Sequence, residues 1–425
     1  MTLANLERTL LFLVLLFLPT QLGRHFWPQF SFIYSLPIDY LSPTLYFWDI
    51  LVIVLWVVCL FSGKHINRLA LTFFYFFILT QTVSLLFNPQ ALGVGFIRLE
   101  QYLIAGLFGV YIASTKWAVL RAKLYTPLAF AVLFESTLAI LQFLKEGTIG
   151  LWILGERSFS LSTPGIAKFD FYGREFLRPY GTFPHPNILA AFMVITVVIL
   201  SSLRKQGSIN KTANWIPAFA GMTTLLTFSR TAIIAGLASA LLILKTRGRL
   251  LLLLVIFLLM PILYTRFAAI FNYDQLTFLR REELTRSALE LFWKNPVSGV
   301  GLNNFIPSLS SELISGPSRF LQPVHNIFLL ALSETGMLGL LGWLGLLGYP
   351  ILKQFPILPV GRQISNLACR QTGLKSCLSA DRFPIIWGTM LFLGLFDHYF
   401  LTLPQGIRLL FLIWGLSLSM LELKA

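Results

Sequence analysis

The sequence predicts an all-α polytopic membrane protein with about twelve transmembrane helices. Hydrophobic residues make up 56% of the 425 positions, charged residues only 12%, and the mean hydropathy is +0.75. Soluble globular chains carry about 25% charged residues, so this composition excludes an ordinary soluble enzyme. The apolar runs, such as 187–203 and 250–260, are continuous, whereas the strands of an outer-membrane barrel would alternate. We therefore expect one integral membrane domain over 1–425.

The candidate spans are apolar stretches of roughly the length that crosses a bilayer, about 20 residues. The first follows Arg8 and resembles a secretory signal, but no Ala-x-Ala-like cleavage site comes after it, so we interpret it as a helix. In chain order the stretches are 9–23, 45–62, 69–87, 97–113, 124–143, 187–203, 214–229, 231–245, 250–267, 336–352, 383–399 and 405–422.

The Lys and Arg residues between these stretches predict the orientation, because cytoplasmic loops are enriched in them. With both termini in the cytoplasm, the inner segments, including the loop 353–382, hold 18 of the 33 basic residues but only Glu7, Asp381 and Glu422 among the acidic ones. The 18 are Arg8, Lys64, Arg68, Lys116, Arg121, Lys123, Arg204, Lys205, Lys211, Lys245, Arg247, Arg249, Lys353, Arg362, Arg370, Lys375, Arg382 and Lys424. The whole excess of 15 positive charges thus lies on one side of the membrane, in short segments between apolar runs. This distribution does not suggest a nucleic-acid partner.

Two long external loops are predicted, 144–186 and 268–335. Long loops without secondary structure are usually functional or disordered, and these contain too many aromatic residues for a solvated linker. Residues 280–293 have the spacing of an amphipathic helix at the membrane interface. The aromatic residues are Trp152, Phe159, Phe169, Phe171, Tyr172, Tyr273, Phe278 and Trp293.

The external segment from Arg178 to Asn187 contains three prolines, which hold an irregular backbone at the membrane edge. Such a backbone is tolerated there only where it is buried in protein or faces a watery cavity. The sequence leaves two interpretations open. The segment forms part of a site, or it is a rigid start of a helix whose Arg178 extends to lipid headgroups.

Arg230 lies at a tight external turn between two predicted spans, at 227–232. A charged side chain close to hydrocarbon is costly unless it has a partner. A guanidinium can hold a phosphate through two parallel hydrogen bonds, which a lysine cannot imitate. Arg230 is therefore a candidate for binding an anion, and the alternatives are a headgroup contact or a salt bridge.

Among the five histidines, His325 is best placed to act as a base. It precedes Asn326 and an apolar stretch that leads to Glu334, and an imidazole accepts a proton near neutral pH. The alternative is a structural histidine that caps the following helix. His185, between two prolines, is interpreted as part of a turn. Glu334 either supports the site or caps a span.

Other polar signals are weaker. Asp397, His398 and Tyr399 could line a pocket, but a polar clasp between two helices is the favoured interpretation. The glycine-rich run 299–303 follows no strand, so it does not predict a phosphate loop. Cys369 and Cys377 lack the spacing of a zinc site. We expect no metal and no other cofactor.

Several of these motifs occur together in an order that resembles a known family. They are Arg178-Pro-Tyr-Gly-Thr-Phe-Pro-His-Pro-Asn187, Phe228-Ser-Arg-Thr-Ala232, Asn295-Pro-Val-Ser-Gly-Val-Gly-Leu-Asn-Asn-Phe305, His325-Asn326 and Glu334-Thr-Gly336. Over about 170–345 the chain resembles the O-antigen ligase and O-antigen polymerase superfamily, and the flanking spans are similar by hydropathy alone.

The resemblance implies a bacterial membrane glycosyltransferase of the C-type class with a large periplasmic loop. Such enzymes transfer a glycan from undecaprenyl pyrophosphate to an acceptor hydroxyl, with inversion and without metal or nucleotide sugar. The acceptor is the lipid A core oligosaccharide in ligases of lipopolysaccharide biosynthesis and another lipid-linked repeat unit in polymerases. The resemblance also places the protein in the inner membrane of the cell envelope, with the active site facing the periplasm.

Residue by residue, the resemblance implies that Arg178 and Arg230 bind the pyrophosphate and that His325 is the base. Arg286 matches a further loop arginine that contacts pyrophosphate or glycan. Supporting positions are Asn326, Glu334, His185 and His398. Some ligases have paired histidines where this chain has Val324 before His325, so the ligase subtype stays open.

We favour a ligase over a polymerase. The alternative from another class is a flippase or other transporter of lipid-linked oligosaccharides. A transporter would carry ionisable residues or broken helices near the middle of the membrane. The central spans here are nearly free of charge, with Glu135 the main exception, and the candidate groups lie on one face, which favours chemistry on an exported substrate.

Overall fold

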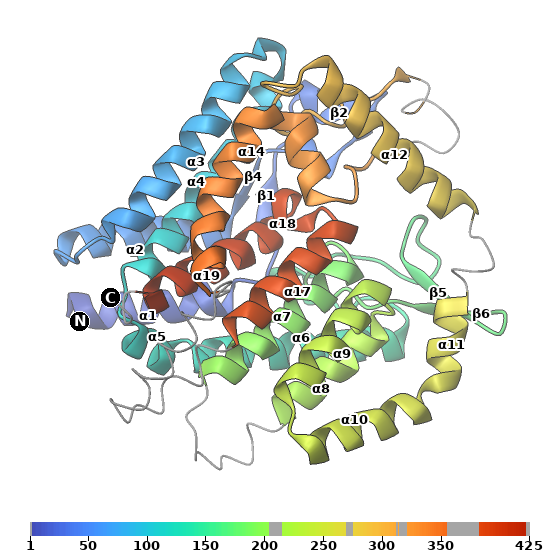
Figure 1. The fold of residues 1–425 in the computed structure, drawn as a ribbon. Coiled ribbons are helices and arrows are strands. Elements are labelled where there is room, and N and C mark those ends of the chain that lie inside the picture. Colours follow the sequence, from blue (N-terminus) through green and yellow to red (C-terminus); the bar gives the residue numbers. More distant parts are fainter. Residues whose placement is uncertain are drawn as a thin grey trace.

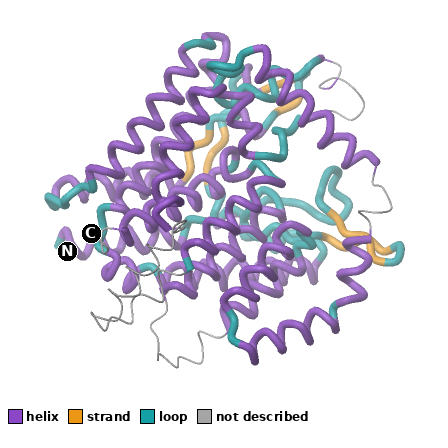
Figure 2. The backbone as a smooth tube through the Cα atoms, in the orientation of Figure 1, coloured by secondary structure: helices purple, strands orange, loops and turns teal. Residues whose placement is uncertain are grey.

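Helices make up most of the computed structural model, which describes residues 2–203, 215–268, 275–311, 313, 321–354 and 382–421 (Figures 1 and 2). The first half contains α1 (Leu3–Leu16), α2 (Phe47–Phe61), α3 (Arg68–Leu86), α4 (Leu92–Ala113), α5 (Trp117–Lys123), α6 (Tyr125–Lys145) and α7 (Pro186–Leu203). The second half contains α8 (Trp215–Leu226), α9 (Arg230–Ile243), α10 (Thr246–Leu258), α11 (Met260–Ala268), α12 (Gln275–Lys294), α14 (Ile327–Gln354), α17 (Phe383–Phe396), α18 (Tyr399–Thr402) and α19 (Pro404–Leu421).

Short antiparallel strand pairs occur only in the loops of the described chain. The segment between α1 and α2 forms two of them, β1 (Gly23–His25) with β4 (Thr44–Tyr46) and β2 (Phe32–Ile33) with β3 (Leu36–Pro37). The third is the hairpin of β5 (Lys168–Phe171) and β6 (Arg174–Leu177), with Lys168 opposite Leu177. Single 3-10 turns cover Gln29–Ser31, Asp39–Leu41, Pro89–Ala91 and Trp152–Leu154.

Polar caps determine where several helices begin. The Asn67 side chain accepts a hydrogen bond of 2.9 Å from the backbone N–H of Ala70 at the start of α3. Before α14, the Asn326 amide oxygen accepts bonds from the N–H groups of Phe328 and Leu329, at 2.9 and 3.1 Å. Both satisfy donors that the first helical turn leaves unpaired.

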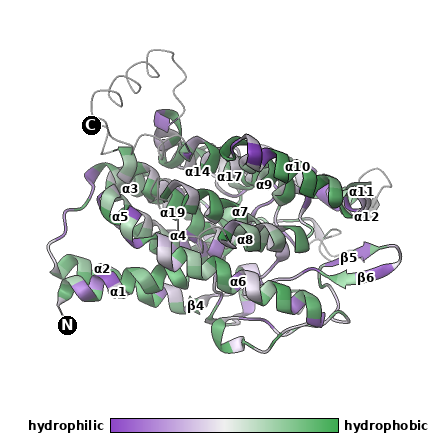
Figure 3. Cartoon of the chain, turned by 90° about the horizontal axis from the view of Figure 1, so that it is seen from below, coloured by the Kyte–Doolittle hydropathy of each residue, from purple (hydrophilic) through white to green (hydrophobic). Residues whose placement is uncertain are grey.

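The most buried candidate spans are α19, at 89%, and α7, at 83%, so they form the centre of the bundle. α19 packs along α4, and α14 packs along α3. α10 and α11 contribute no buried residue and bend by 65° relative to each other at the side of the bundle (Figure 1). In Figure 3 the helices are largely hydrophobic, and the β5–β6 hairpin carries hydrophilic residues.

The all-α polytopic fold predicted from the sequence is confirmed, whereas the count of twelve spans is not. Six of the described helices are long and apolar enough to cross a membrane, or seven if the bent pair α10–α11 counts as one span. Four further apolar helices, α2, α8, α9 and α17, are shorter. Each predicted stretch overlaps a helix, but α1 ends at Leu16 instead of continuing to 23.

α14 also differs from the prediction, because it begins at Ile327, inside the stretch 268–335 that the sequence predicted as an external loop. Gly336, with φ of +61° and ψ of −163°, interrupts its helical backbone. The cytoplasmic loop predicted over 353–382 lies almost entirely outside the described residues, as do Cys369 and Cys377.

The start of α1 and the end of α19 lie at the same end of the bundle (Figure 1). There Lys64, which follows α2, contacts Glu7 of α1 at 3.0 Å and donates to the hydroxyl of Thr115 after α4. Ser419 of α19 donates to the backbone oxygen of Thr115. Several segments predicted on the inner side thus meet. The segments that precede α7 and α14 belong to the opposite end.

Candidate active site

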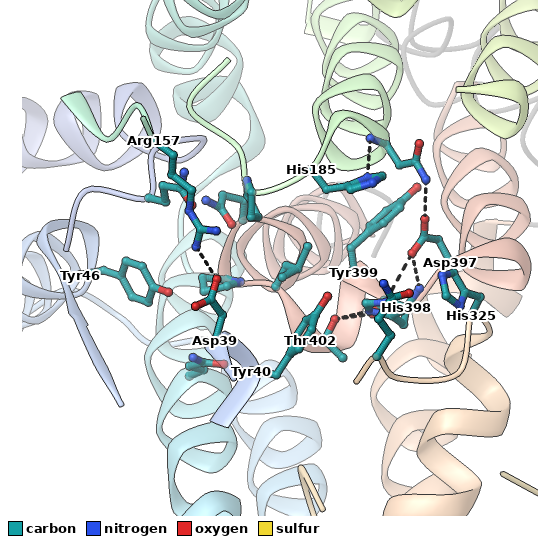
Figure 4. Close-up of a pocket in the computed structure, with 18 of the residues that line it drawn as sticks. Asp39, Tyr40, Tyr46, Arg157, His185, His325, Asp397, His398, Tyr399 and Thr402 are labelled. Atoms are coloured by element: carbon teal, nitrogen blue, oxygen red, sulfur yellow. Dashed lines mark hydrogen bonds and ion pairs between the residues drawn. The ribbon is translucent and has the colours of Figure 1, made fainter. Parts of the chain in front are cut away.

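A polar cavity of about 180 Å³ lies where the segments between helices meet at that opposite end (Figure 4). Its walls come from the loop after α1, the segment before α7, the residues preceding α14 and the α17–α19 connection. The lining residues are Gln21, His25, Asp39, Tyr40, Tyr46, Gln101, Arg157, Pro184, His185, Asn187, Gln322, His325, Asp397, His398, Tyr399, Thr402, Leu403, Pro404 and Gln405.

The proline-containing segment before α7 is buried and held by two side chains of α6. The Gln142 amide oxygen accepts from the N–H groups of Tyr180 and Gly181, at 3.0 and 2.8 Å. The Glu135 carboxylate accepts from the N–H and the hydroxyl of Thr182. Glu135, the main charged exception in the central predicted spans, therefore supports this irregular backbone. A backbone of this kind is tolerated at the membrane edge only where it is buried in protein or faces a watery cavity.

Asn187, the last residue of that motif, connects Arg178 with Asp397. Its amide oxygen accepts a 2.7 Å bond from Nη2 of Arg178, and its Nδ2 donates a 3.1 Å bond to Oδ2 of Asp397. Nε of Arg178 donates to the backbone oxygen of Thr227 in the turn before α9. Three motifs that are far apart in the sequence thus form one hydrogen-bonded chain.

Arg178, Arg230 and Arg266 form a group of cations beside this chain. Nε of Arg230 donates to the backbone oxygen of Arg266 at 3.1 Å, and Nε of Arg266 donates to that of Phe228 at 2.7 Å. Burial and then the nearby charge of Arg230 lower the pKa of Arg178 to about 10, so it stays protonated at neutral pH. Grouped guanidinium groups favour an anionic ligand.

An aromatic contact joins the β5–β6 hairpin, which precedes Arg178, to the turn that precedes Arg230. Phe169 of β5 stacks on Phe228 with ring centroids 3.9 Å apart, and the guanidinium of Arg266 lies 5.9 Å from the Phe169 ring. The β5–β6 hairpin of the predicted external loop 144–186 is therefore attached to the turn that carries Arg230.

His325 lines the cavity directly before α14. Because Asn326 supplies the helix cap, the structure does not use the histidine for that purpose. Its Nδ1 is buried and has no hydrogen-bond partner among the described residues. Burial lowers the pKa of His325, Asp397 acts in the opposite direction and Arg281 lowers it further. The net shift is downward, so the imidazole is neutral at pH 7.

Asp397 and His398 lie beside His325, whose ring centroid is 5.2 Å from that of His398 (Figure 4). The Nδ1 of His398 is 2.7 Å from the Thr402 hydroxyl, which orients the ring. Burial raises the pKa of Asp397, but the three nearby histidines and the bond from Asn187 outweigh it and leave the pKa below its usual value. Asp397 is thus a charged carboxylate at neutral pH, next to the histidines of this cluster.

The remaining two histidines of the cluster are uncharged at neutral pH. Burial above all lowers the pKa of His398 to about 3 and that of His185 to about 4. Nδ1 of His185 accepts a 3.1 Å bond from the N–H of Asn187. His185 is therefore both part of the turn, as the sequence indicated, and part of the cavity wall.

His325, Asp397 and His398 also offer potential metal-ligand atoms, all within 4.8 Å of one another. Around a tetrahedral zinc ion, ligand atoms bound at about 2.0 Å lie roughly 3.3 Å from one another. The 4.8 Å limit on the distances between the atoms of this cluster is wider. The spacing therefore does not by itself define a metal centre.

Glu334 lies outside the cavity wall and belongs to a backbone contact between α14 and the glycine-rich run 299–303. The N–H of Gly301 donates to the backbone oxygen of Glu334 at 2.8 Å. A Cβ on Gly299 would lie 2.3 Å from the Glu334 carbonyl carbon, and one on Gly336 would lie 2.4 Å from the Val297 oxygen. The run is a close-packed structural element.

The same run supports the α17–α19 connection through Arg98 of α4. Nη2 of Arg98 donates to the Asn303 amide oxygen at 2.9 Å, and Nη1 donates to the backbone oxygen of Thr402. Asn303, at φ of +59°, donates in turn to the backbone oxygen of Tyr40 at 2.9 Å. Two walls of the cavity are thereby tied together.

Arg286 is the one candidate that the structure leaves apart from the others. It lies on an exposed side of α12 and contacts Glu282 at 3.8 Å within the same helix. The charge that acts on His325 from α12 is that of Arg281. Of the sequence candidates, the cavity wall includes His185, His325 and His398.

Arg266 and the Asp39–Tyr40 turn were not recognised from the sequence. Gln405 belongs to the same polar run as Asp397 and His398, for which a clasp between two helices was the favoured interpretation. The polar run from Asp397 to Gln405 between two apolar spans was the one available signal. Arg266 and the Asp39–Tyr40 turn lie in short segments, and only the tertiary fold determines which residues lie next to them.

No curated protein matches the chain. Residues 216–344 match the family model described as O-antigen ligase, a region that contains Arg230, Arg286, His325 and Glu334. This match confirms the predicted resemblance of the chain to the O-antigen ligase and O-antigen polymerase superfamily, whose members are glycosyltransferase-like enzymes.

Proposed function

We propose that this multi-pass membrane protein transfers a glycan from undecaprenyl pyrophosphate to an acceptor hydroxyl, with the lipid A core oligosaccharide as the favoured acceptor. The family match supports the reaction class. The observation that carries the proposal is the buried, unpartnered Nδ1 of His325 in a polar cavity with Asp397 and His398.

His325 is proposed as the base. Its lowered pKa keeps the imidazole neutral at pH 7, so Nδ1 can accept a proton from a sugar hydroxyl. As the hydroxyl loses its proton, its oxygen attacks the anomeric carbon of the donor sugar, and the bond from that carbon to the phosphate oxygen breaks. The attack comes from the side opposite the leaving group, which inverts the anomeric centre. The proton stays on His325, and the pyrophosphate departs with the electron pair.

Arg178 and Arg230 are proposed to stabilise the charge that develops on the departing pyrophosphate, which requires preorganised cations near the leaving oxygen. The bond from Arg178 to the backbone oxygen of Thr227, in the turn that leads to Arg230, and the nearby charge of Arg230 support a common role. Arg266, bonded to the same turn, joins them in this proposal. The three guanidinium groups supply the charge stabilisation without a metal.

Asn187 is proposed to align the two halves of this site, because it bonds both to Arg178 and to Asp397. Asp397 in turn stabilises the imidazolium that forms on His325 as the proton is transferred. Arg286, being exposed on α12, is proposed to contact the donor glycan outside the cavity. Asn326 and Glu334 serve the site by fixing the start of α14 and its contact with the glycine-rich run.

The cavity end of the bundle is proposed to face the periplasm and both chain termini the cytoplasm of a bacterial inner membrane. The basic inner segments support this orientation, because loops rich in Lys and Arg stay in the cytoplasm. The donor and acceptor would then be exported lipid-linked glycans.

The test is a transfer assay with purified protein in liposomes that contain undecaprenyl-pyrophosphate glycan. Lipid A core and a second lipid-linked repeat unit are offered separately. Glycan attached to lipid A core would establish a ligase, and a ladder of lengthening lipid-linked chains would establish the alternative, a polymerase. Absence of product with both acceptors would refute the proposed transfer, and carrier lipid crossing the bilayer would then indicate a flippase.

A further inference from the structure

Gln405, the second residue of α19, is one of the residues that line the cavity, and the proposed chemistry does not use its amide group. The residue is 1% exposed, yet neither its Nε2 nor its Oε1 has a hydrogen-bond partner among the described residues. Leaving a buried polar group unsatisfied costs about 1–3 kcal/mol. An amide in this situation is suited to a ligand that offers both a donor and an acceptor.

Gln21 is a second amide in the same wall, and its Nε2 also has no partner in the described part of the chain. Its position is coupled to that of Gln405 through Arg408, which lies almost one turn further along α19. Nη1 of Arg408 donates to the backbone oxygens of Leu18 and Thr20, at 3.4 and 2.8 Å. The segment that carries Gln21 is thereby attached to the start of α19.

The same cavity has a second polar side away from His325. Asp39 and Arg157 form an ion pair of 2.9 Å there, near Tyr46 and across the cavity from His325, Asp397 and His398 (Figure 4). Both members of the pair are partly exposed, at 49 and 40% of their side chains. Their charges balance each other, so this side favours a neutral polar ligand over a phosphate.

Resting on the proposed function, we propose that Gln405 and Gln21 form a subsite for the acceptor sugar, binding hydroxyl groups next to the one that His325 deprotonates. A glutamine amide offers two donors and one acceptor, and neighbouring sugar hydroxyls can meet both kinds of group. The arginines that serve the pyrophosphate join the cavity from the other direction, through Asn187 and Asp397, which leaves the amides to the acceptor.

The size of the cavity limits what the subsite holds. About 180 Å³ is less than the roughly 300 Å³ of the smallest sites for drug-sized ligands. This volume is of the order of one sugar ring, so we propose that one ring of the acceptor lies in the cavity and the rest of the acceptor lies outside it. In this proposal the subsite binds the terminal sugar of the acceptor.

The variant that tests this is Gln405→Met, which keeps the length of the side chain and removes both polar atoms. Because the amide is unsatisfied without a ligand, we expect the variant to unfold at an equal or higher temperature. We expect its KM for the acceptor to rise about tenfold while its KM for the donor stays unchanged. A residue with a merely structural role would lower thermal stability and would leave the acceptor KM unchanged.

Gln354→Met is the matched control. Gln354, the last residue of α14, is also buried, and its Oε1 also has no partner among the described residues. It does not line the cavity, and its Nε2 donates to the backbone oxygen of Ser417 of α19 at 3.4 Å. We expect this variant to keep its acceptor KM, because Gln354 lies outside the cavity wall. Lipid A core and a lipid-linked repeat unit are titrated separately as acceptors, because either could present the sugar.

A binding measurement separates this inference from the proposed function. Free core oligosaccharide is titrated into full-length wild type and Gln405→Met in nanodiscs, with microscale thermophoresis as the readout. Binding that weakens about tenfold in the variant supports the subsite, even if wild type transfers no glycan. Equal binding by both proteins, or a change in the donor KM alone, overturns it even if wild type is an active transferase.

Discussion

Asn187 donates a hydrogen bond of 3.1 Å to the carboxylate of Asp397, although 210 positions separate the two residues. The same side chain accepts from Arg178. The proposed base region and the proposed phosphate-binding region are thus aligned through one amide, which can donate to a carboxylate and accept from a guanidinium at the same time.

Substitution of this amide should therefore uncouple the two regions. We expect Asn187→Ala to lower the transfer rate at least tenfold, and Asn187→Asp to lower it further, because a second carboxylate would face Asp397. Initial rates in liposomes measure the effect. Asn5→Ala, in α1 at the opposite end of the bundle, is the control and should match wild type. An Asn187→Ala protein of normal rate would show that the bridge is dispensable.

His325 should control the dependence of the rate on pH. Burial lowers its pKa below 6.5, and the base acts only when neutral, so kcat/KM should be constant near pH 7 and fall as the pH drops through that lowered pKa. His325→Ala should retain donor binding, lose most of the transfer rate and lose this acidic limb. A limb with its midpoint above 6.5, or one that persists in the variant, would assign the titration to another group.

Arg230 should be essential for the leaving group. We expect Arg230→Ala to abolish transfer, Arg230→Lys to restore little of it because lysine cannot make two parallel bonds, and Arg266→Ala to weaken donor binding. Loss of donor affinity is measured with labelled lipid-linked glycan. Arg68→Ala, exposed at the start of α3, is the control. Arg286→Ala should have the smallest effect of the proposed donor-binding arginines, and unchanged turnover in Arg230→Ala would remove it from the mechanism.

The contact between α14 and the glycine-rich run should depend on Gly336. Its backbone angles are open almost only to glycine, and a Cβ would lie 2.4 Å from the Val297 oxygen. We expect Gly336→Ala to destabilise the protein by at least about 2 kcal/mol, seen as a lower unfolding temperature in detergent. Gly348→Ala on the same helix, where a Cβ meets nothing within 4 Å, should be neutral or stabilising. Equal unfolding temperatures would contradict the close contact.

Transfer should survive EDTA, because arginines supply the proposed charge stabilisation. Activity that EDTA removes and magnesium restores would overturn the metal-free mechanism.

The sequence predicted the fold class and the helical regions because both follow from continuous apolar runs. It could not predict that α14 begins at Ile327, since the break at Gly336 depends on a backbone contact with residues 297–299. The motifs around Arg178, Arg230 and His325 were recognisable in the chain. Their connection through Asn187 and Asp397 was not, because residues 210 positions apart show no pattern in one sequence.

The central claim is tested most directly by comparing wild type with His325→Ala in liposomes that contain undecaprenyl-pyrophosphate glycan and lipid A core. The proposal predicts glycan-capped lipid A core with wild type, and little or no product with the variant at equal donor binding. Capping at the same rate by both proteins would contradict His325 as the base, and no product from wild type with lipid A core or with a second lipid-linked repeat unit would contradict the proposed transfer itself.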